Sequence, residues 1–404
     1  MLKTLTRGTL CAGRYIGSYH YIHSSTAAAA SKVVATRVLL PKSQARLEAQ
    51  GLNLVQWKQD SAMPRDTLLK EIKGKRAEAL MCMLSDKIDG EVLEAAGERD
   101  SRHNLLLKKC KGPQLKLVTT MSVGYDHIDL ETCRKNNIKI GYTPDVLTDA
   151  TADLTVLLTL AAARKMKQGI RAAENGEWGV WRPSWLCGSQ FAGKTLGVVG
   201  LGRIGEAVAH RLKAFGIDRV LYWGRRDKPE LNAKLGAEFA SFDKLLAESD
   251  YIVACCSLTP ETKEIFNYAA FEKMKPSAIF TNTARGGVVK QDDLGIRASF
   301  YFLGLVNAET NIVRALEQNL IAGAGLDVTT PEPLPTDNKL FNLPNCVILP
   351  HIGKSEYVDK MALMDGYTLA GSATVEAREV MGDMCVDNVL AALRNSKIPF
   401  ELKA

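Results

Sequence analysis

A buried strand that runs into a glycine-rich turn and then into a helix lies in the middle of this chain of 404 residues. The stretch 195–205 reads TLGVVGLGRIG, an apolar run followed by Gly200, Gly202 and Gly205 at G-x-G-x-x-G spacing. The next residues, EAVAHRLKAFG, place apolar side chains at helical spacing. Such a turn offers backbone N–H groups and the positive end of a helix to a pyrophosphate. It predicts a dinucleotide site that includes the three glycines together with Arg203 and Ile204.

Short apolar segments alternate with helical segments on both sides of this turn, which predicts parallel sheets with helical crossovers. Strands are expected within 33–41, 52–57, 79–86, 115–120 and 138–145, and later within 219–223, 251–258, 278–285, 323–328 and 346–350. One long amphipathic helix is expected over 147–176, and the chain is helical again from Ser372. We predict two doubly wound α/β domains. A Rossmann-type cofactor domain (148–351) is inserted in a split flavodoxin-like substrate domain (33–147 and 352–404).

Composition excludes several classes of partner. The net charge of +7 is dispersed, and no basic stripe with interleaved aromatic residues indicates nucleic-acid binding. No run of 18 apolar residues is long enough for a membrane span. The nine cysteines show no C-x-x-C spacing, so neither a metal site nor a disulfide framework is expected. A loop rich in tryptophan and glycine at 176–188 is interpreted as core, pocket wall or a contact with a second copy in a homodimer.

The first 32 residues differ from the rest of the chain. No Asp or Glu precedes Glu48, and Lys3, Arg7 and Arg14 are spaced among Ser, Thr, Ala and Tyr. This acid-poor, basic composition is typical of a mitochondrial transit peptide, and a continuous apolar signal segment is absent from it. Mitochondrial localisation is therefore expected. The alternative is an unprocessed N-terminal tail on a cytoplasmic protein.

The end of the strand after the glycine turn bears on the choice of cofactor. An NAD site usually places an Asp or Glu about 20 residues past the glycines, where it accepts a hydrogen bond from the ribose 2′-hydroxyl. Here Arg225 and Arg226 follow the strand, and no carboxylate occurs before Asp227. Two guanidinium groups suit a 2′-phosphate. The sequence favours NADPH, with NADH as the alternative if both arginines are solvated turn residues.

Four further motifs accompany the glycine turn: MSVGYD (121–126), TNTARGG (281–287), AGLDVTTPEP (324–333) and LPHIG (349–353). In this order they resemble the D-isomer-specific 2-hydroxyacid dehydrogenases over nearly all of the chain after the leader. Within that family, GYTPDVLTDAT, WLCG, SLTPET and CVILPHIG are most similar to the branch that reduces glyoxylate and hydroxypyruvate. The resemblance implies NADPH-dependent reduction of these small 2-keto acids to glycolate and D-glycerate.

The same resemblance, combined with chemical reasoning, implies catalytic roles for three residues. His351 follows a strand beside a glycine and is expected to donate the proton, while Glu332 holds its imidazole in the correct tautomer. Arg285 precedes Gly286-Gly287, and its planar fork is expected to hold the substrate carboxylate and carbonyl oxygen. The other five histidines lie in the leader, in a charged segment, in a helix or after Asp126, which is expected to start a helix.

Further residues are assigned to binding. Val123 and Gly124 are expected to offer backbone N–H groups to the substrate carboxylate, and Ser257 to line the substrate or the cofactor phosphate. Asp327 is expected to accept from the nicotinamide carboxamide or to tune Arg285. Thr283 and Gly353 are assigned to the cofactor site with it.

Two other functions fit the same sequence features. One is a non-catalytic, dinucleotide-sensing scaffold of the same fold, and the other is a different D-2-hydroxyacid dehydrogenase, such as a phosphoglycerate dehydrogenase. A test of turnover in a protein that binds the dinucleotide distinguishes the scaffold from an enzyme.

Three segments depart from the family pattern, at about 98–112, 295–312 and 354–371. The third separates His351-Ile352-Gly353 from Ser372-Ala373-Thr374, which the family reads without a break. Our hypothesis is that the second and third segments are translated introns from a gene-model error. Real surface loops are the alternative, because loop closure costs little extra as a loop lengthens. Peptides from 356–370 in a mass spectrum of the native protein would contradict the intron hypothesis.

Overall fold

The computed structural model describes residues 30–59, 61–73, 77–96, 115–290, 311–352 and 375–403. The expected leader lies almost entirely outside the described residues, as do Gly353 and nearly all of the three segments that depart from the family pattern. Residues 31–404 form one compact unit, and the elements below belong to it.

The first sheet is built from five parallel strands in the order β2-β1-β3-β4-β5. The order is the flavodoxin-like one that the sequence predicts. The strands are β1 (Lys32–Ala35), β2 (Asn53–Gln56), β3 (Ala77–Cys82), β4 (Leu117–Thr120) and β5 (Lys139–Gly141). The connecting helices are α1 (Pro41–Glu48), α2 (Arg65–Ile72), α3 (Gly90–Ala95) and α4 (Leu130–Lys135).

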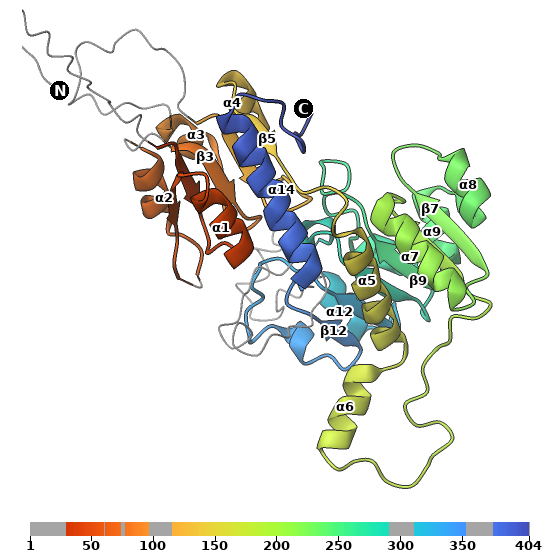
Figure 1. Cartoon of the computed structure of the whole chain (residues 1–404). Helices are drawn as coiled ribbons and strands as arrows, with labels where there is room; N and C mark the ends of the chain where they lie inside the picture. Colours follow the sequence, from red (N-terminus) through yellow and green to blue (C-terminus); the bar gives the residue numbers. More distant parts are fainter. Residues whose placement is uncertain are drawn as a thin grey trace, which may run out of the picture. The chain divides into compact units, whose positions relative to one another are not determined.

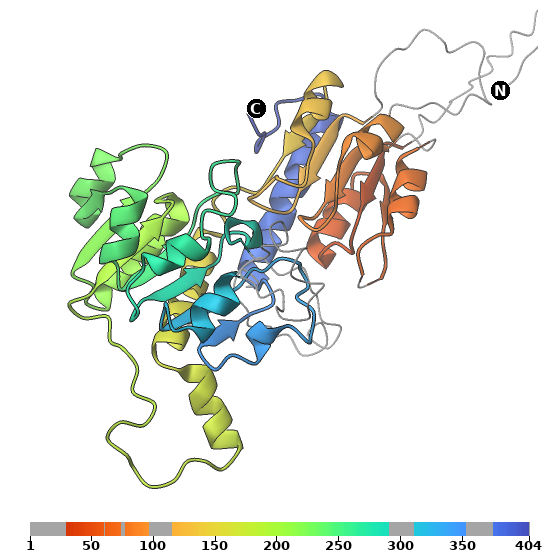
Figure 2. The ribbon, with the colours of Figure 1, turned by 180° about the vertical axis from the view of Figure 1, so that it is seen from behind.

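A helix from the far end of the chain completes this first layer. Helix α14 (Val375–Leu393) lies along the sheet (Figures 1 and 2) and buries Cys385, Val386 and Val389 against Val33 and Leu117. The buried amide of Asn388 accepts a hydrogen bond from the Phe400 N–H at 3.0 Å, which fixes the chain after the helix. The C-terminal residues therefore return to the first sheet.

The second sheet has seven parallel strands in the order β12-β11-β10-β9-β6-β7-β8. They are β6 (Thr195–Val199), β7 (Arg219–Trp223), β8 (Ala237–Phe239), β9 (Tyr251–Ala254), β10 (Ile279–Asn282), β11 (Gly323–Leu326) and β12 (Cys346–Ile348). The edge strand β8 is missing from the sequence-based prediction, because three residues show no periodicity. The strand order reverses between β6 and β9, and a doubly wound sheet binds its ligands at such a point.

Helices cover both faces of the second sheet, so its strands are buried on each side. One face packs against α5 (Thr148–Ala163) and α7 (Arg203–Ala214), and the other against α9 (Phe242–Glu248), α10 (Tyr268–Glu272) and α12 (Asn311–Glu317). The other helices of the described residues are α6 (Met166–Glu174), α8 (Pro229–Leu235) and the short 3-10 turns η1 (Gly286–Val288) and η2 (Lys339–Phe341). Among the helices of the described residues, none is both long and apolar enough to cross a membrane.

The single helix expected over 147–176 is two helices, and the prediction was wrong on this point. Lys165 adopts a left-handed backbone conformation with φ of +53° and separates α5 from α6. The new direction lets the Lys167 ammonium donate to the carbonyl oxygens of Phe341, Leu343 and Cys346 at 2.7–2.9 Å. Burial lowers the pKa of this ammonium. The break is a tertiary effect that helical periodicity does not reveal.

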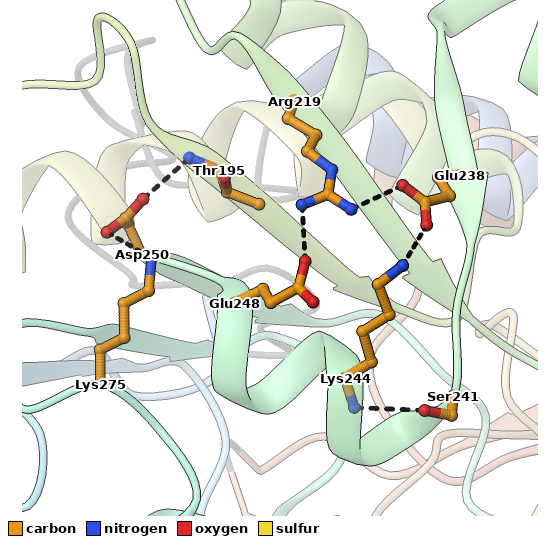
Figure 3. A network of polar contacts seen from close by, with 8 residues as sticks. All are labelled: Thr195, Arg219, Glu238, Ser241, Lys244, Glu248, Asp250 and Lys275. Atoms are coloured by element: carbon orange, nitrogen blue, oxygen red, sulfur yellow. Dashed lines mark hydrogen bonds and ion pairs between the residues drawn. The ribbon is translucent and has the colours of Figure 1, made fainter.

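An ion-pair network joins neighbouring elements at the amino-terminal edge of the second sheet (Figure 3). Arg219, at the start of β7, donates to Glu238 of β8 at 2.7 Å and to Glu248 before β9 at 2.6 Å. Asp250 accepts from the Thr195 N–H at 2.9 Å and from Lys275 at 3.0 Å. The candidate site lies at the opposite, carboxyl-terminal edge of the same strands.

Candidate active site

The glycine turn lies where the strand order of the second sheet reverses, at the carboxyl end of β6. Gly200 has φ of +97°, and a Cβ there would stand 2.6 Å from the Cα of Cys256, two residues after β9. A Cβ on Gly205 would stand 2.5 Å from the Gly200 carbonyl oxygen. Gly202 is the N-cap residue of α7 and has open space beside it. The turn thus fits a pyrophosphate against bare backbone.

The two residues after Gly202 have different surroundings. Arg203 is exposed and forms an ion pair of 2.6 Å with Asp145, whose own φ is +71°. Ile204 is half-buried against the apolar cluster around Val208. The structure therefore places Arg203 beside the turn and uses Ile204 in packing.

The cofactor prediction depends on the residues after β7. Arg225 and Arg226 are exposed in the bend that follows Trp223. Asp227 is engaged elsewhere, since it accepts from the Tyr222 hydroxyl, from Asn232 at 3.1 Å and from the Lys228 N–H at 2.7 Å. The Tyr222 and Asn232 hydrogen bonds hold the pKa of the Asp227 carboxyl below its ordinary value. This carboxylate is held by its own loop.

Lys228 is a cation that sequence reasoning missed. Its ammonium donates to the Leu201 carbonyl oxygen inside the glycine turn at 2.6 Å, and its N–H donates to the Tyr222 hydroxyl at 2.8 Å. The positive charge after β7 therefore reaches back to the turn. In the sequence, its position directly after Asp227 was the only signal that could have placed Lys228 near the cofactor site.

The turn after β10 presents Arg285. The buried amide of Asn282 donates to the Arg285 carbonyl oxygen at 2.9 Å and accepts from the Ala284 N–H at 3.0 Å, which closes the turn. Thr283 points toward α5, where its hydroxyl shares a hydrogen bond of 2.7 Å with Thr155. Asn282 lies in the quoted motif, but sequence reasoning assigned it no role.

Arg285 reaches from the second sheet to the loop that follows β4 in the first. Its side chain is 14% exposed and forms an ion pair of 3.2 Å with Asp126. A Cβ on Gly124 would overlap the Arg285 Nη2 atom, so a larger residue there would displace the end of the arginine side chain. The backbone N–H groups of Val123 and Gly124 have no acceptor among the described residues. Three of the predicted substrate-binding residues therefore lie together.

The predicted imidazole and carboxylate also meet. His351, which follows β12 with φ of +56°, bonds through Nδ1 to the Glu332 carboxylate at 2.7 Å. Its Nε2 is buried and has no hydrogen-bond partner among the described residues. Burial raises the pKa of the Glu332 carboxyl, but His351, the Thr329 N–H and the charge of Arg285 outweigh burial and hold it below the ordinary value.

A backbone contact connects the arginine turn with the His–Glu pair. A Cβ on Gly286 would overlap the Thr329 carbonyl oxygen. The N–H of that same Thr329 donates to Glu332 at 2.9 Å. Asp327 is buried after β11, and its N–H donates to the Asn282 carbonyl oxygen at 3.0 Å. Ser257 is exposed after β9, beside the cysteines that contact Gly200.

Asp126 was assigned the wrong structural role. It was expected to start a helix, but α4 begins at Leu130, with Asp129 as the N-cap that accepts from the Thr132 N–H at 3.0 Å. Asp126 instead faces Arg285. Of the predicted site residues, Gly353 lies outside the described part of the chain. Within that part, no group of three His, Cys, Asp or Glu side chains is arranged to hold a metal ion.

The combination of a Rossmann-type glycine turn with an arginine and a His–Glu pair at the same strand edges is that of a nicotinamide-dependent dehydrogenase. Comparisons with known proteins agree. The model of the D-isomer specific 2-hydroxyacid dehydrogenase NAD binding domain matches residues 156–297 and 304–353. The chain belongs to the D-isomer specific 2-hydroxyacid dehydrogenases and is an oxidoreductase with a nicotinamide dinucleotide cofactor.

Several relatives are similar over nearly their full length. The human glyoxylate reductase/hydroxypyruvate reductase is 42% identical over 92% of this chain and 98% of its own. The glyoxylate reductase of Thermococcus kodakarensis is 38% identical over 91% of this chain and 94% of its own. A crystal structure from Thermus thermophilus, 38% identical, aligns with a TM-score of 0.73 over 92% of this chain and 99% of that one.

His127, next to Asp126, is half-buried, and its Nδ1 atom is enclosed. Its Nε2 shares a hydrogen bond of 3.0 Å with the Thr120 hydroxyl, and its Nδ1 has no partner among the described residues. Burial lowers the pKa of this imidazole to about 4, against the opposing charges of Asp126 and Asp86. The His127 side chain holds the loop after β4 in place through the Thr120 hydrogen bond. No local pattern in the sequence indicated that this imidazole is removed from solvent.

The lowered pKa of His127 predicts a pH dependence of stability. Below pH 6.5 the unfolded chain binds a proton at this imidazole that the folded protein binds only near pH 4. Stability is therefore lost as the pH falls, by about 2 kcal/mol between pH 6.5 and 5. Urea denaturation should show this loss in the wild type and in His210→Gln, an exposed-histidine control, and a much smaller loss in His127→Gln. Equal slopes in all three would contradict it.

Proposed function

We propose that this enzyme reduces glyoxylate and hydroxypyruvate to glycolate and D-glycerate with NADPH. The observation that carries the proposal is the His351 imidazole, bonded through Nδ1 to Glu332 with Nε2 buried and unpartnered among the described residues. That arrangement leaves one ring nitrogen to give a proton to a keto oxygen. The names of the human and Thermococcus relatives support the choice of substrate.

The residues divide the work in the following way. The cofactor, when bound, supplies the hydride to the keto carbon. Arg285 binds the substrate carboxylate and keto oxygen, and the Val123 and Gly124 N–H groups add donors to the carboxylate. His351 donates its Nε2 proton to the keto oxygen, and Glu332 stabilises the charged imidazole and fixes its tautomer.

The direct test is NADPH oxidation, followed by absorbance, with glyoxylate, hydroxypyruvate and pyruvate. Turnover with the first two is expected, and His351→Gln should lower kcat by about 10²–10⁴ because general acid catalysis is lost. NADPH affinity should stay within about twofold, since the imidazole is not a phosphate ligand. His210→Gln serves as the control and should match the wild type. A wild-type protein that binds NADPH without turning over any keto acid would instead be the dinucleotide-sensing scaffold.

The preference for NADPH over NADH rests on the loop after β7. Arg225 and Arg226 are exposed where a 2′-phosphate would lie, and Asp227 is committed to Tyr222 and Asn232. A ribose 2′-hydroxyl thus lacks its usual carboxylate partner, whereas a phosphate gains two guanidinium groups.

Replacing both arginines by alanine should raise the KM for NADPH at least about tenfold, since each charged hydrogen bond contributes roughly 1.5–3 kcal/mol. The KM for NADH should change by less than about threefold, because its ribose carries no phosphate to pair with them. Lys234→Ala is the control: it removes a positive charge that lies on the neighbouring helix α8 and pairs with Glu206. The KM values for NADPH and for NADH should both stay near those of the wild type. An equal loss for both cofactors would contradict the assignment.

We also propose that the protein is a homodimer held by α6 and the loop after it, which extend away from the second sheet (Figure 1). Trp178, Val180 and Trp181 are 76%, 84% and 84% exposed there. Large apolar side chains gathered on a surface mark a contact with another protein. A second copy of this chain is the partner proposed.

Sedimentation of the purified protein should give the mass of two chains, and the double substitution Trp178→Ser, Trp181→Ser should give the mass of one. Val38→Ser removes another exposed apolar side chain, 45% exposed on the first domain, and should leave the dimer intact. A double variant that still sediments as the wild type does would place the interface elsewhere.

A further inference from the structure

We propose that Asp126 is a positioning residue for Arg285. The Asp126 carboxylate binds one edge of the guanidinium and leaves one N–H on each terminal nitrogen for the 2-keto acid. The inference rests on the proposed function, because it assigns a role within the same substrate site. Asp126 comes from the first sheet and Arg285 from the second, so the pair also joins the two halves of the site.

The hydrogen bonds of Arg285 account for three of its five N–H groups. The Asp126 Oδ1 atom accepts from Nε at 3.3 Å and from Nη2 at 3.2 Å. The Ala284 carbonyl oxygen accepts from Nη1 at 2.9 Å. A guanidinium has one N–H on Nε and two on each terminal nitrogen. Among the described residues, one N–H on Nη1 and one on Nη2 therefore remain, which matches the carboxylate and keto oxygens of a 2-keto acid.

The loop that carries Asp126 is held firmly enough to orient a partner. The Ser122 hydroxyl donates to the Gly124 carbonyl oxygen, and the Ile88 N–H donates to the His127 carbonyl oxygen at 2.9 Å. The half-buried His127 ring shares a hydrogen bond with the Thr120 hydroxyl. Gly124 contacts Nη2 directly, with no space for a side chain between them. Asp126 therefore acts from a fixed backbone position.

The charge of Asp126 by itself would hinder the proposed reaction. Burial raises the pKa of this carboxyl, but the charge and hydrogen bonds of Arg285 outweigh burial and keep it ionised. A carboxylate beside the substrate site repels an anionic substrate, whereas its hydrogen bonds orient the arginine. Removing the side chain thus tests the two effects against each other, because they change substrate affinity in opposite directions.

The experiment measures the binding of oxamate, which carries a carboxylate beside a carbonyl and needs no turnover, to the NADPH-bound protein by calorimetry. Asp126→Ala should weaken oxamate binding about tenfold, since the guanidinium loses its orientation. Asp126→Asn keeps an oxygen acceptor while it removes the charge, so it should bind oxamate at least as tightly as the wild type. Asp153→Ala, which removes an exposed partner of Arg211, is the matched control and should be neutral.

Unchanged or tighter oxamate binding in Asp126→Ala would overturn the inference, because the residue would then be a surface charge that merely repels anions. A double-mutant cycle adds a second criterion: Asp126→Ala should lower kcat in the wild type but by less than about twofold in an Arg285→Lys background. Equal losses in both backgrounds would indicate a general structural role and would also overturn it.

The outcomes separate the two proposals. A wild-type protein that binds oxamate but reduces no keto acid would refute the proposed function, while the oxamate affinities of the variants still decide the role of Asp126. The inference alone would be refuted if the wild-type protein reduces glyoxylate and Asp126→Ala is unimpaired both in oxamate binding and in kcat. A wild-type protein that neither binds oxamate nor turns over a keto acid would refute both.

Discussion

The contact between the Arg285 guanidinium and the bare backbone of Gly124 is the constraint on which the candidate substrate site depends. A side chain at position 124 would overlap Nη2 and displace the guanidinium, so the arginine can lie against this backbone because residue 124 is glycine. The arginine then meets an acidic partner from the first sheet, while its own turn is closed by Asn282. A site assembled from two sheets needs such a fixed point, because catalytic geometry tolerates little displacement.

The second half of the site depends on backbone contacts as much as on side chains. Gly286 packs on the carbonyl of Thr329, and the N–H of Thr329 orients Glu332. The carboxylate in turn orients the imidazole of His351. Arg285, Glu332 and His351 therefore lie in the segments that follow three neighbouring strands of one parallel sheet, β10, β11 and β12, and the spacing of these strands brings the segments close together. The ion pairs at the opposite edge (Figure 3) lie away from this chemistry.

Much of this arrangement could be predicted from the sequence, because it is encoded in local patterns. Alternating apolar segments indicated the fold class, and the glycines at 200, 202 and 205 marked the dinucleotide turn. His351, Glu332 and Arg285 stand in short motifs at strand ends, where parallel sheets place their functional groups. The break at Lys165, the burial of His127 and the partner of Asp126 could not be found in this way. The first and the last depend on neighbours far away in the sequence: Lys167 binds the carbonyls of 341–346, and Asp126 binds an arginine 159 residues later.

The hydrogen bonds of Asp227 have a consequence for engineering. The carboxylate is shared by a tyrosine hydroxyl, an asparagine amide and a main-chain N–H, and Lys228 links the same loop to the glycine turn. Recruiting Asp227 to a ribose would break that cluster and loosen the pyrophosphate turn with it. A redesigned nucleotide preference would have to start from a newly introduced acid nearer the end of β7, with the tyrosine-centred cluster left intact.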